Sequence, residues 1–164
     1  MAQHKIKIDY EPTDWILELI GAIGIIFIFV IPAYFYNSLP DIIPQHFNAK
    51  GEVDGHGNKN SIWILPAIEI ALYSGLFWLA KFPHIFNYPI KITHENTHRQ
   101  YKYATRSMRI LNVSVVWIFC YLSYSSIQSA LGNQNGPGKY FILVFLLLIL
   151  GPISIYLFKS ARAK

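Results

Sequence analysis

Four long apolar runs constrain the fold of this chain more than any other feature of its sequence. They cover residues 15–36, 62–80, 110–131 and 140–158. A helix needs about 20 predominantly apolar residues to cross the hydrocarbon core of a bilayer, and each run is close to that length. The sequence therefore predicts an all-α integral membrane protein with four transmembrane helices, in which residues 1–164 form a single membrane domain.

The composition supports this interpretation. Charged residues make up 14% of the chain and hydrophobic residues 53%, whereas soluble domains carry about 25% charged residues. The single cysteine, Cys120, lies inside an apolar run, so no disulfide can form within the chain. The first run is too long for the apolar core of a cleavable signal peptide. The predicted partner of the surface is thus the lipid bilayer, and nothing in the sequence predicts nucleic-acid binding.

The basic residues predict the orientation. Eleven of the fourteen lie in the two termini or between the second and third runs, and three lie in the other two connections. Because basic residues concentrate in cytoplasmic loops, we expect cytoplasmic termini, a cytoplasmic loop over 81–109 and an outer loop over 37–61. The residues expected to meet anionic headgroups before the third helix are Arg99, Lys102, Arg106 and Arg109. The basic residues of the tail that count toward the orientation are Lys159, Arg162 and Lys164.

The outer loop contains the stretch "LPDIIPQHFNAKGEVDGHGNK", residues 39–59. Prolines end the first helix because proline lacks an amide donor and clashes with the preceding turn. The part from His46 onward predicts a compact hairpin, a short extracytoplasmic cap between the first two helices. The residues expected to supply positive φ angles are Asn48, Gly51, Gly55 and Gly57. Those expected to pack as an apolar lid are Ile42, Ile43, Phe47 and Val53.

The same loop carries the candidate binding residues. They are Asp41, His46, Phe47, Asp54 and His56, and loops held by a rigid scaffold often serve recognition. The alternative is a cap whose polar residues only serve its turns. The acids and histidines match no zinc module and lack the regular oxygen pattern of a calcium loop. We therefore predict no metal site and no cofactor.

The outer loop resembles a signature with proline, histidine, phenylalanine and glycine in an uncharacterised bacterial membrane domain, a domain of unknown function. That domain forms the N-terminal part of SdpI-type immunity proteins, multi-pass proteins that protect cells from a secreted antimicrobial peptide. The matching positions are Leu39, Pro40, Pro44, His46, Phe47, Gly51, Asp54, Gly55 and Lys59. Segment 87–101 is similar to a recurrent stretch of standalone members. The chain lacks the C-terminal signature of the immunity proteins.

Glu69 lies near the middle of the second run. An ionised carboxylate is costly at that depth, so such residues usually face the interior of a helix bundle. The expected hydrogen-bond partners at similar depth in the third run are Tyr121, Tyr124, Ser125 and Gln128. The carboxyl group then either joins two helices or serves as a proton or ion site. Glu18, near the cytoplasmic end of the first run, is expected to pair with Lys81 or Arg109.

The stretch "HENTH", residues 94–98, formally matches the zinc-protease pattern H-E-x-x-H. Its Thr and Asn are weak helix formers, and no third ligand follows, so we expect no catalytic residues and no enzyme activity. Thr93 is the expected cap of a helix that continues into the third run. A zinc hydrolase that uses this stretch is the enzymatic alternative.

The leading interpretation is a non-enzymatic, multi-pass protein of the bacterial inner membrane whose outward-facing loop recognises a ligand. The resemblance suggests immunity or resistance to an antimicrobial peptide, with a peptide or another membrane protein as partner. Two alternatives are ion- or proton-coupled transport centred on Glu69 and a structural subunit of a membrane complex. The polar residues of the third run are compatible with a homo- or hetero-oligomer.

Overall fold

The computed structural model describes residues 5–163, so Lys164 lies outside the described residues. Its four helices are α1 (Pro12–Phe35), α2 (Ile64–Leu79), α3 (Thr97–Ala130) and α4 (Phe141–Arg162). All four are long and apolar enough to cross a membrane, α2 together with the 3₁₀ turn Lys59–Trp63 that precedes it. The predicted mostly helical, membrane-type architecture is confirmed.

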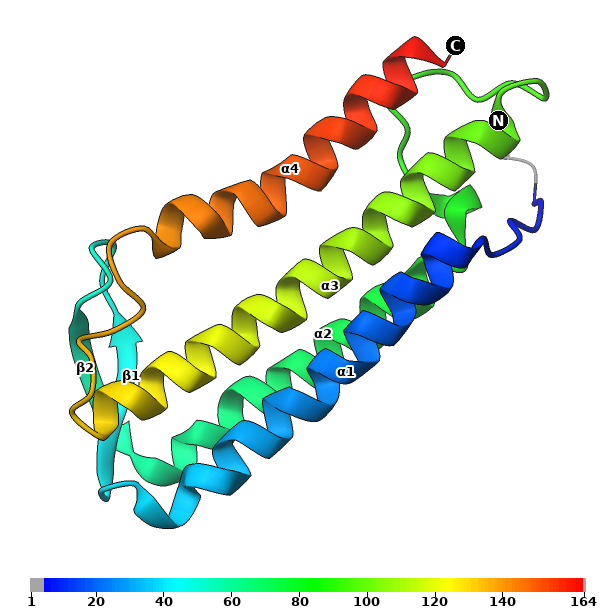
Figure 1. Cartoon of the computed structure of the whole chain (residues 1–164). Helices are drawn as coiled ribbons and strands as arrows, with labels where there is room; N and C mark the ends of the chain where they lie inside the picture. The colour runs from blue at the N-terminus through cyan, green and yellow to red at the C-terminus, as the bar shows by residue number, and fades with distance from the viewer. Residues whose placement is uncertain (1–4, 164) are drawn as a thin grey trace.

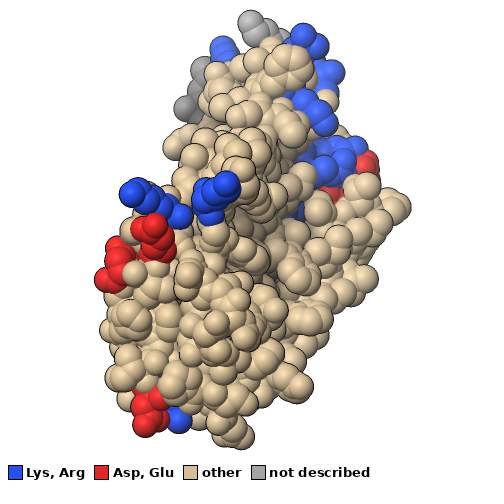
Figure 2. All heavy atoms as spheres, turned by 60° about the vertical axis from the view of Figure 1, so that its left-hand side comes forward, with Lys and Arg blue, Asp and Glu red and all other residues tan. Residues whose placement is uncertain are grey.

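The longest helix, α3, is the centre of the bundle. It packs against α1 and α2 on one side and against α4 on the other (Figure 1). Both termini lie at one end of the bundle, which we call the charged end, and a β-hairpin covers the opposite end, the hairpin end. On the face that Figure 2 shows, the surface between the two ends carries few charged residues.

The start of α3 differs from the expectation. The helix begins at Thr97, well before the apolar run 110–131, so about half of the predicted loop 81–109 is helical. Hydropathy alone marks only the apolar part of a helix, and the polar first turns lie outside it. The N-cap is Asn96 rather than Thr93. The two residues exchange hydrogen bonds, from Thr93 N to Asn96 Oδ1 at 2.9 Å and from Asn96 N to Thr93 Oγ1 at 3.3 Å.

Glycines of α1 allow close helix packing. A Cβ added at Gly24 would lie 2.8 Å from Cγ1 of Val116 on α3, and one added at Gly21 would lie 2.8 Å from the ring of Tyr73 on α2. Small residues let helix backbones approach one another, which is how membrane helices gain packing contacts without a hydrophobic driving force between them. The close approach of α1 and α3 also allows a hydrogen bond, in which Cys120 Sγ donates to the carbonyl of Gly24 at 3.3 Å.

Helix α4 is the most exposed of the four. None of the residues in its most apolar window is buried. At the charged end it is held by Gln100 of α3, whose Nε2 donates to the carbonyls of Ala163 at 2.9 Å and Ser160 at 3.1 Å. The Ser160 hydroxyl donates back to Gln100 Oε1 at 2.6 Å. This buried polar clamp joins α4 to the bundle near its C-terminus.

Candidate functional site

The connection between α1 and α2 forms a two-stranded antiparallel hairpin. Its strands are β1 (Ile42–Phe47) and β2 (Val53–Asn58). The strand β1 starts four residues before the predicted hairpin, and the pairing register shifts on both sides of His46. Such irregularities re-aim side chains locally and are frequent near functional sites.

The turn of the hairpin is built by Asn48. Its Oδ1 accepts hydrogen bonds from the amides of Lys50 at 2.8 Å and Glu52 at 3.1 Å, in the manner of an Asx turn. Gly51 completes the turn with a φ angle of 79°, which glycine adopts without a steric penalty. The predicted positive φ is therefore confirmed at Gly51 and wrong at Asn48.

The prediction is also wrong for Gly55 and Gly57, which lie in extended backbone within β2. Here glycine makes room for side chains of the facing strand. A Cβ added at Gly55 would lie 3.0 Å from Cβ of His46, and one added at Gly57 would overlap the side chain of Gln45. The glycines therefore suggest a turn in the sequence, but they lie in a strand, where the absence of a side chain leaves room for the facing strand.

The hairpin is fixed to the bundle through β1. Ile43 is 1% exposed and belongs to a buried cluster whose other members are Leu39, Ile62 and Ile127. The hydroxyl of Ser126 on α3 donates to the carbonyl of Pro44 at 2.6 Å. Ile42 departs from the predicted apolar lid, because its side chain is 60% exposed.

Two of the candidate binding residues meet on the exposed surface of the hairpin. His46 Nδ1 forms a hydrogen-bonded pair with Asp54 Oδ1 across the strands. His56 is exposed on β2. Asp41 lies apart at the base of the hairpin, where its carboxylate is 3.2 Å from the ammonium of Lys59.

The fifth candidate, Phe47, is half-buried and lines a cavity beneath the hairpin. This cavity has a volume of about 240 Å³ and lies between β1, α2 and α3. Its walls are mainly apolar, with Leu65 and Leu122 facing the strand, and Ser61 supplies a buried hydroxyl without a hydrogen-bond partner among the described residues. An apolar concavity with a few polar groups is typical of ligand sites.

No group of three or more His, Cys, Asp or Glu side chains comes together within residues 5–163 in a way that would hold a metal ion. His94 lies in the turn that precedes α3, so the "HENTH" stretch does not form the continuous helix that a zinc-protease motif requires.

Glu69 is fully buried between the helices, as expected from its position. Both of its carboxyl oxygens lack a hydrogen-bond partner among the described residues. The same holds for two buried polar atoms of α3, Oδ1 of Asn112 and Oγ of Ser123. Unsatisfied buried polar groups are rare and call for an explanation in water, an ion or function.

The expected partners of Glu69 do not reach it. Tyr121 instead donates to the carbonyl of Pro137 at 2.8 Å, and Tyr124 is 44% exposed. Both tyrosines lie on the exposed side of α3, whereas Glu69 is buried inside the bundle. Depth in the membrane is readable from sequence, whereas the rotation of a helix about its axis is not.

A network of ion pairs joins α1 to α3 at the charged end. Of its contacts, only the pairing of Glu18 was predicted from the sequence. Three acids of the N-terminal part of α1, Glu11, Asp14 and Glu18, face three basic residues of α3, Lys102, Arg106 and Arg109. The acids are spaced three and four residues apart and the bases four and three apart, so each set shares one helical face. The matching three- and four-residue spacings of the acids and of the bases are the sequence feature from which this network was predictable.

The geometry of this network is tight. Arg106 donates to Asp14 through Nε at 3.0 Å and to Glu11 through Nη2 at 2.8 Å, and Lys102 also pairs with Glu11. Hydrogen bonding to Arg106 and Lys102 holds the pKa of Glu11 below its usual value. Three basic residues predicted to meet lipid headgroups thus bind α1 instead. The predicted pairing of Glu18 with Arg109 is confirmed, with Nε and Oε1 3.1 Å apart.

Comparison with known proteins is consistent with this architecture. Residues 23–70 match the family model described as a domain of unknown function, DUF1648. The match spans the second half of α1, the hairpin and the first part of α2. An uncharacterised protein of Archaeoglobus fulgidus is 24% identical over 158 residues, which cover 88% of this chain and 85% of the relative. No solved structure matches. The resemblance of the loop to a domain of unknown function is confirmed.

Proposed function

We propose that this chain is a non-enzymatic, multi-pass membrane protein whose hairpin recognises a peptide on the outer side of the cell membrane. The observation that carries the proposal is the combination of two features on one anchored strand. On β1, His46 forms an exposed pair with Asp54, and its neighbour Phe47 lines an apolar cavity. An apolar side chain of a peptide fits such a cavity, while a histidine–carboxylate pair offers donor and acceptor atoms.

Immunity against a secreted antimicrobial peptide is the role that this recognition best serves. The support is the resemblance of the loop to SdpI-type immunity proteins, together with an anchored hairpin on which two of the matching residues, His46 and Asp54, are exposed. Sequestration of the peptide at the membrane surface needs no catalytic group. In this proposal the four helices hold the hairpin in place and keep its cavity at the outer membrane surface, where a membrane-active peptide first binds.

The test is protection of sensitive bacteria that express the full chain, challenged with a panel of purified secreted antimicrobial peptides. We expect protection against at least one peptide, and we expect Phe47→Ala and His46→Ala to remove it. Asp41→Asn is the matched control, because Asp41 pairs with Lys59 away from the cavity. Each variant is quantified in the membrane fraction. Protection that survives Phe47→Ala and His46→Ala, or its absence throughout the panel, contradicts the proposal.

The sidedness has its own test. Cys120 is buried, so the wild-type chain offers a low background for thiol labelling. A membrane-impermeant maleimide applied to intact cells should label Lys50→Cys on the hairpin and should leave Lys91→Cys unlabelled. The reverse pattern would place the termini and the basic segment outside, contrary to the positive-inside distribution.

A second function is favoured by one specific observation, the buried Glu69, whose carboxyl oxygens have no hydrogen-bond partner in the described part of the chain. A carboxyl group at membrane depth, in a bundle whose helix α3 carries two further unsatisfied polar atoms, is suited to hold a proton or a small cation. Proteoliposomes that contain a pH-sensitive dye measure such flux. We expect Glu69→Gln to lower it to the level of empty vesicles, with Glu52→Gln on the hairpin as control. Flux that is absent or unchanged removes this candidate.

A further inference from the structure

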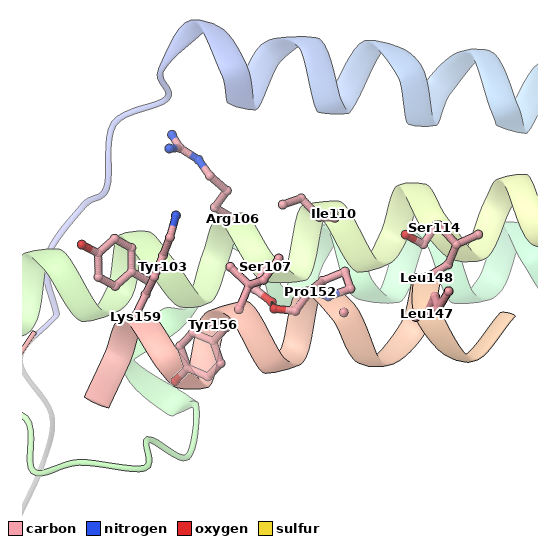
Figure 3. A pocket seen from close by; sticks show the side chains of 12 residues that line it. Tyr103, Arg106, Ser107, Ile110, Ser114, Leu147, Leu148, Pro152, Tyr156 and Lys159 are labelled. Carbon is pink, nitrogen blue, oxygen red and sulfur yellow. Dashed lines mark hydrogen bonds between the residues drawn. The ribbon is translucent and has the colours of Figure 1, made fainter. Parts of the chain in front are cut away.

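A groove between α3 and α4 at the charged end carries both a cation and an apolar wall. It has a volume of about 310 Å³, and side chains of both helices line it (Figure 3). Tyr103 and Lys159 lie at the end of the groove near the termini. Toward the middle of the bundle the wall is apolar, formed by Ile110, Leu147, Leu148 and Ile155.

Gly151 leaves open space on the α4 side of the groove. A Cβ added at this position would meet no atom within 4 Å, so the helix is notched beside open space. The hydroxyl of Ser107 donates to the carbonyl of Pro152 at 3.1 Å and joins the two helices at the edge of the notch. The opening is therefore a fixed feature of the packed pair of helices.

The two basic residues of the groove differ in whether an acidic side chain already neutralises their charge. Arg106 is turned toward α1, where Glu11 and Asp14 neutralise it (Figure 3). Lys159 has no acidic partner within 4.0 Å among the described residues, and its ammonium lies 5.9 Å from the centre of the Tyr103 ring. An exposed ammonium beside a tyrosine at the mouth of an apolar groove is complementary to an anionic group with a hydrocarbon chain attached.

The dimensions match one leaflet of a bilayer. From Leu148 to Lys159 the helix axis rises about 16 Å, at about 1.5 Å per residue. This is close to half of a hydrocarbon core about 30 Å thick. A chain that lies along the apolar wall would thus bring its headgroup to the level of Lys159. The charge distribution predicts that this leaflet is the cytoplasmic one, which carries anionic lipids.

We propose that the groove between α3 and α4 is a binding site for an anionic phospholipid. One acyl chain lies in the notch at Gly151, and the phosphate pairs with the ammonium of Lys159. This site is independent of the hairpin and of Glu69, so it stands whether or not those regions have the roles proposed above. Basic pockets between transmembrane helices on the cytoplasmic side are a known means of headgroup recognition.

Native mass spectrometry of the full chain in detergent tests this site, with phosphatidylglycerol and phosphatidylcholine as the two probes. The wild type should retain phosphatidylglycerol in preference to phosphatidylcholine. Lys159→Gln should lower phosphatidylglycerol occupancy about fivefold, the effect of one basic residue near a membrane surface. Gly151→Leu fills the notch without a backbone clash and should lower the occupancy of both lipids.

Two control variants match these changes. Lys139→Gln removes a lysine near the other end of α4. The ammonium of Lys139 lies 4.9 Å from the ring centre of Tyr140, so it is also a lysine beside a tyrosine. Gly75→Leu fills similarly open space on α2. Both should retain wild-type lipid occupancy. The proposal is overturned if Lys159→Gln and Lys139→Gln have equal effects, or if Gly151→Leu leaves lipid binding unchanged. It is also overturned if Gly151→Leu converts a dimer to a monomer, since a second copy would then occupy the groove.

Discussion

Arg109 of α3 and Glu18 of α1 form a buried ion pair at the charged end of the bundle. The guanidinium Nε lies 3.1 Å from the Glu18 carboxylate, and the two side chains are 7% and 15% exposed. The guanidinium also lies 3.5 Å from Asp14 and covers the ring of Tyr10 at 4.2 Å. One basic residue thus neutralises carboxylates on two turns of α1 and fixes the rotation of α1 relative to α3.

Removal of this guanidinium should destabilise the bundle strongly. We expect Arg109→Leu to lower the free energy of unfolding by about 3 kcal/mol, because a buried carboxylate left without its partner is costly. Unfolding by SDS in mixed micelles, followed by circular dichroism, measures the change. Lys7→Ala is the control, since its pair with Asp9 is almost fully exposed and should contribute less than about 1 kcal/mol.

The double variant Arg109→Leu/Glu18→Leu separates the ion pair from general packing. It should be less destabilised than the sum of the two single variants, because neither charge is then left unpaired. Strict additivity of the two changes would mean that the pair has no mutual interaction.

The stability of the charged end should fall in acid. The pKa of Glu11 is held below its usual value by Arg106 and Lys102. The unfolded chain therefore binds a proton to Glu11 more readily than the folded chain does. The contribution of Glu11 is complete above the ordinary glutamate pKa of about 4.3 and is lost as the pH falls from there through the lower folded-state pKa.

The measurement is the melting temperature between neutral pH and strong acid. Glu11→Gln should reduce the acid-dependent loss of stability relative to the wild type, and Asp9→Asn should leave it as in the wild type, because this exposed carboxylate lies outside the network. An unchanged acid profile in Glu11→Gln would show that the network does not stabilise the fold through this residue.

Close packing of α1 on α3 should depend on Gly24. A valine there would collide with Val116, whose Cγ1 lies 2.8 Å from the position of an added Cβ. We expect Gly24→Val to cost about 1–3 kcal/mol of unfolding free energy, as overpacking in a filled core does. Gly75→Val, which has open space around it, is the control.

A smaller residue at position 116 should compensate for a larger one at position 24. Val116→Ala should restore part of the stability lost in Gly24→Ala, because it removes the methyl groups that the new Cβ would meet. Destabilisation of Gly24→Ala that stays the same in the presence of Val116→Ala would assign the effect to something other than this contact.

The hairpin tip should be sensitive to any side chain at Gly51. Two costs combine there, a φ angle of 79° and a Cβ position 2.7 Å from the carbonyl oxygen of Gly138. Gly132 has a similar φ angle of 77° but open space. Gly132→Ala should cost about 1 kcal/mol for the backbone conformation alone, and Gly51→Ala should cost more.

Hydrogen exchange measured by mass spectrometry locates the effect. Gly51→Ala should accelerate exchange in β1 and β2, because the tip loses its support from the loop between α3 and α4. Gly132→Ala should leave the hairpin amides protected. Equal exchange in the two variants would contradict a supporting contact between Gly51 and Gly138.

Several elements were predictable from local sequence. The four spans, the hairpin after the first helix and the burial of Glu69 follow from residue composition and from turn residues along the chain. The pairing of Glu18 with Arg109 followed from their expected depth. The roles of Gly55 and Gly57 did not, because glycine between turn residues suggests a turn, whereas here it accommodates the side chains of the opposite strand.

Membrane insertion of four helices is a property of the amino-acid order alone, because the cost of polar groups in hydrocarbon is imposed residue by residue. The rotation of each helix was settled only when the helices packed against one another. That packing turned Lys102, Arg106 and Arg109 from the lipid surface to α1 and directed Tyr121 to the loop before α4. It also left Glu69 without a hydrogen-bond partner within residues 5–163. Contacts of this kind depend on distances between segments that lie far apart in the chain, so no local pattern encodes them.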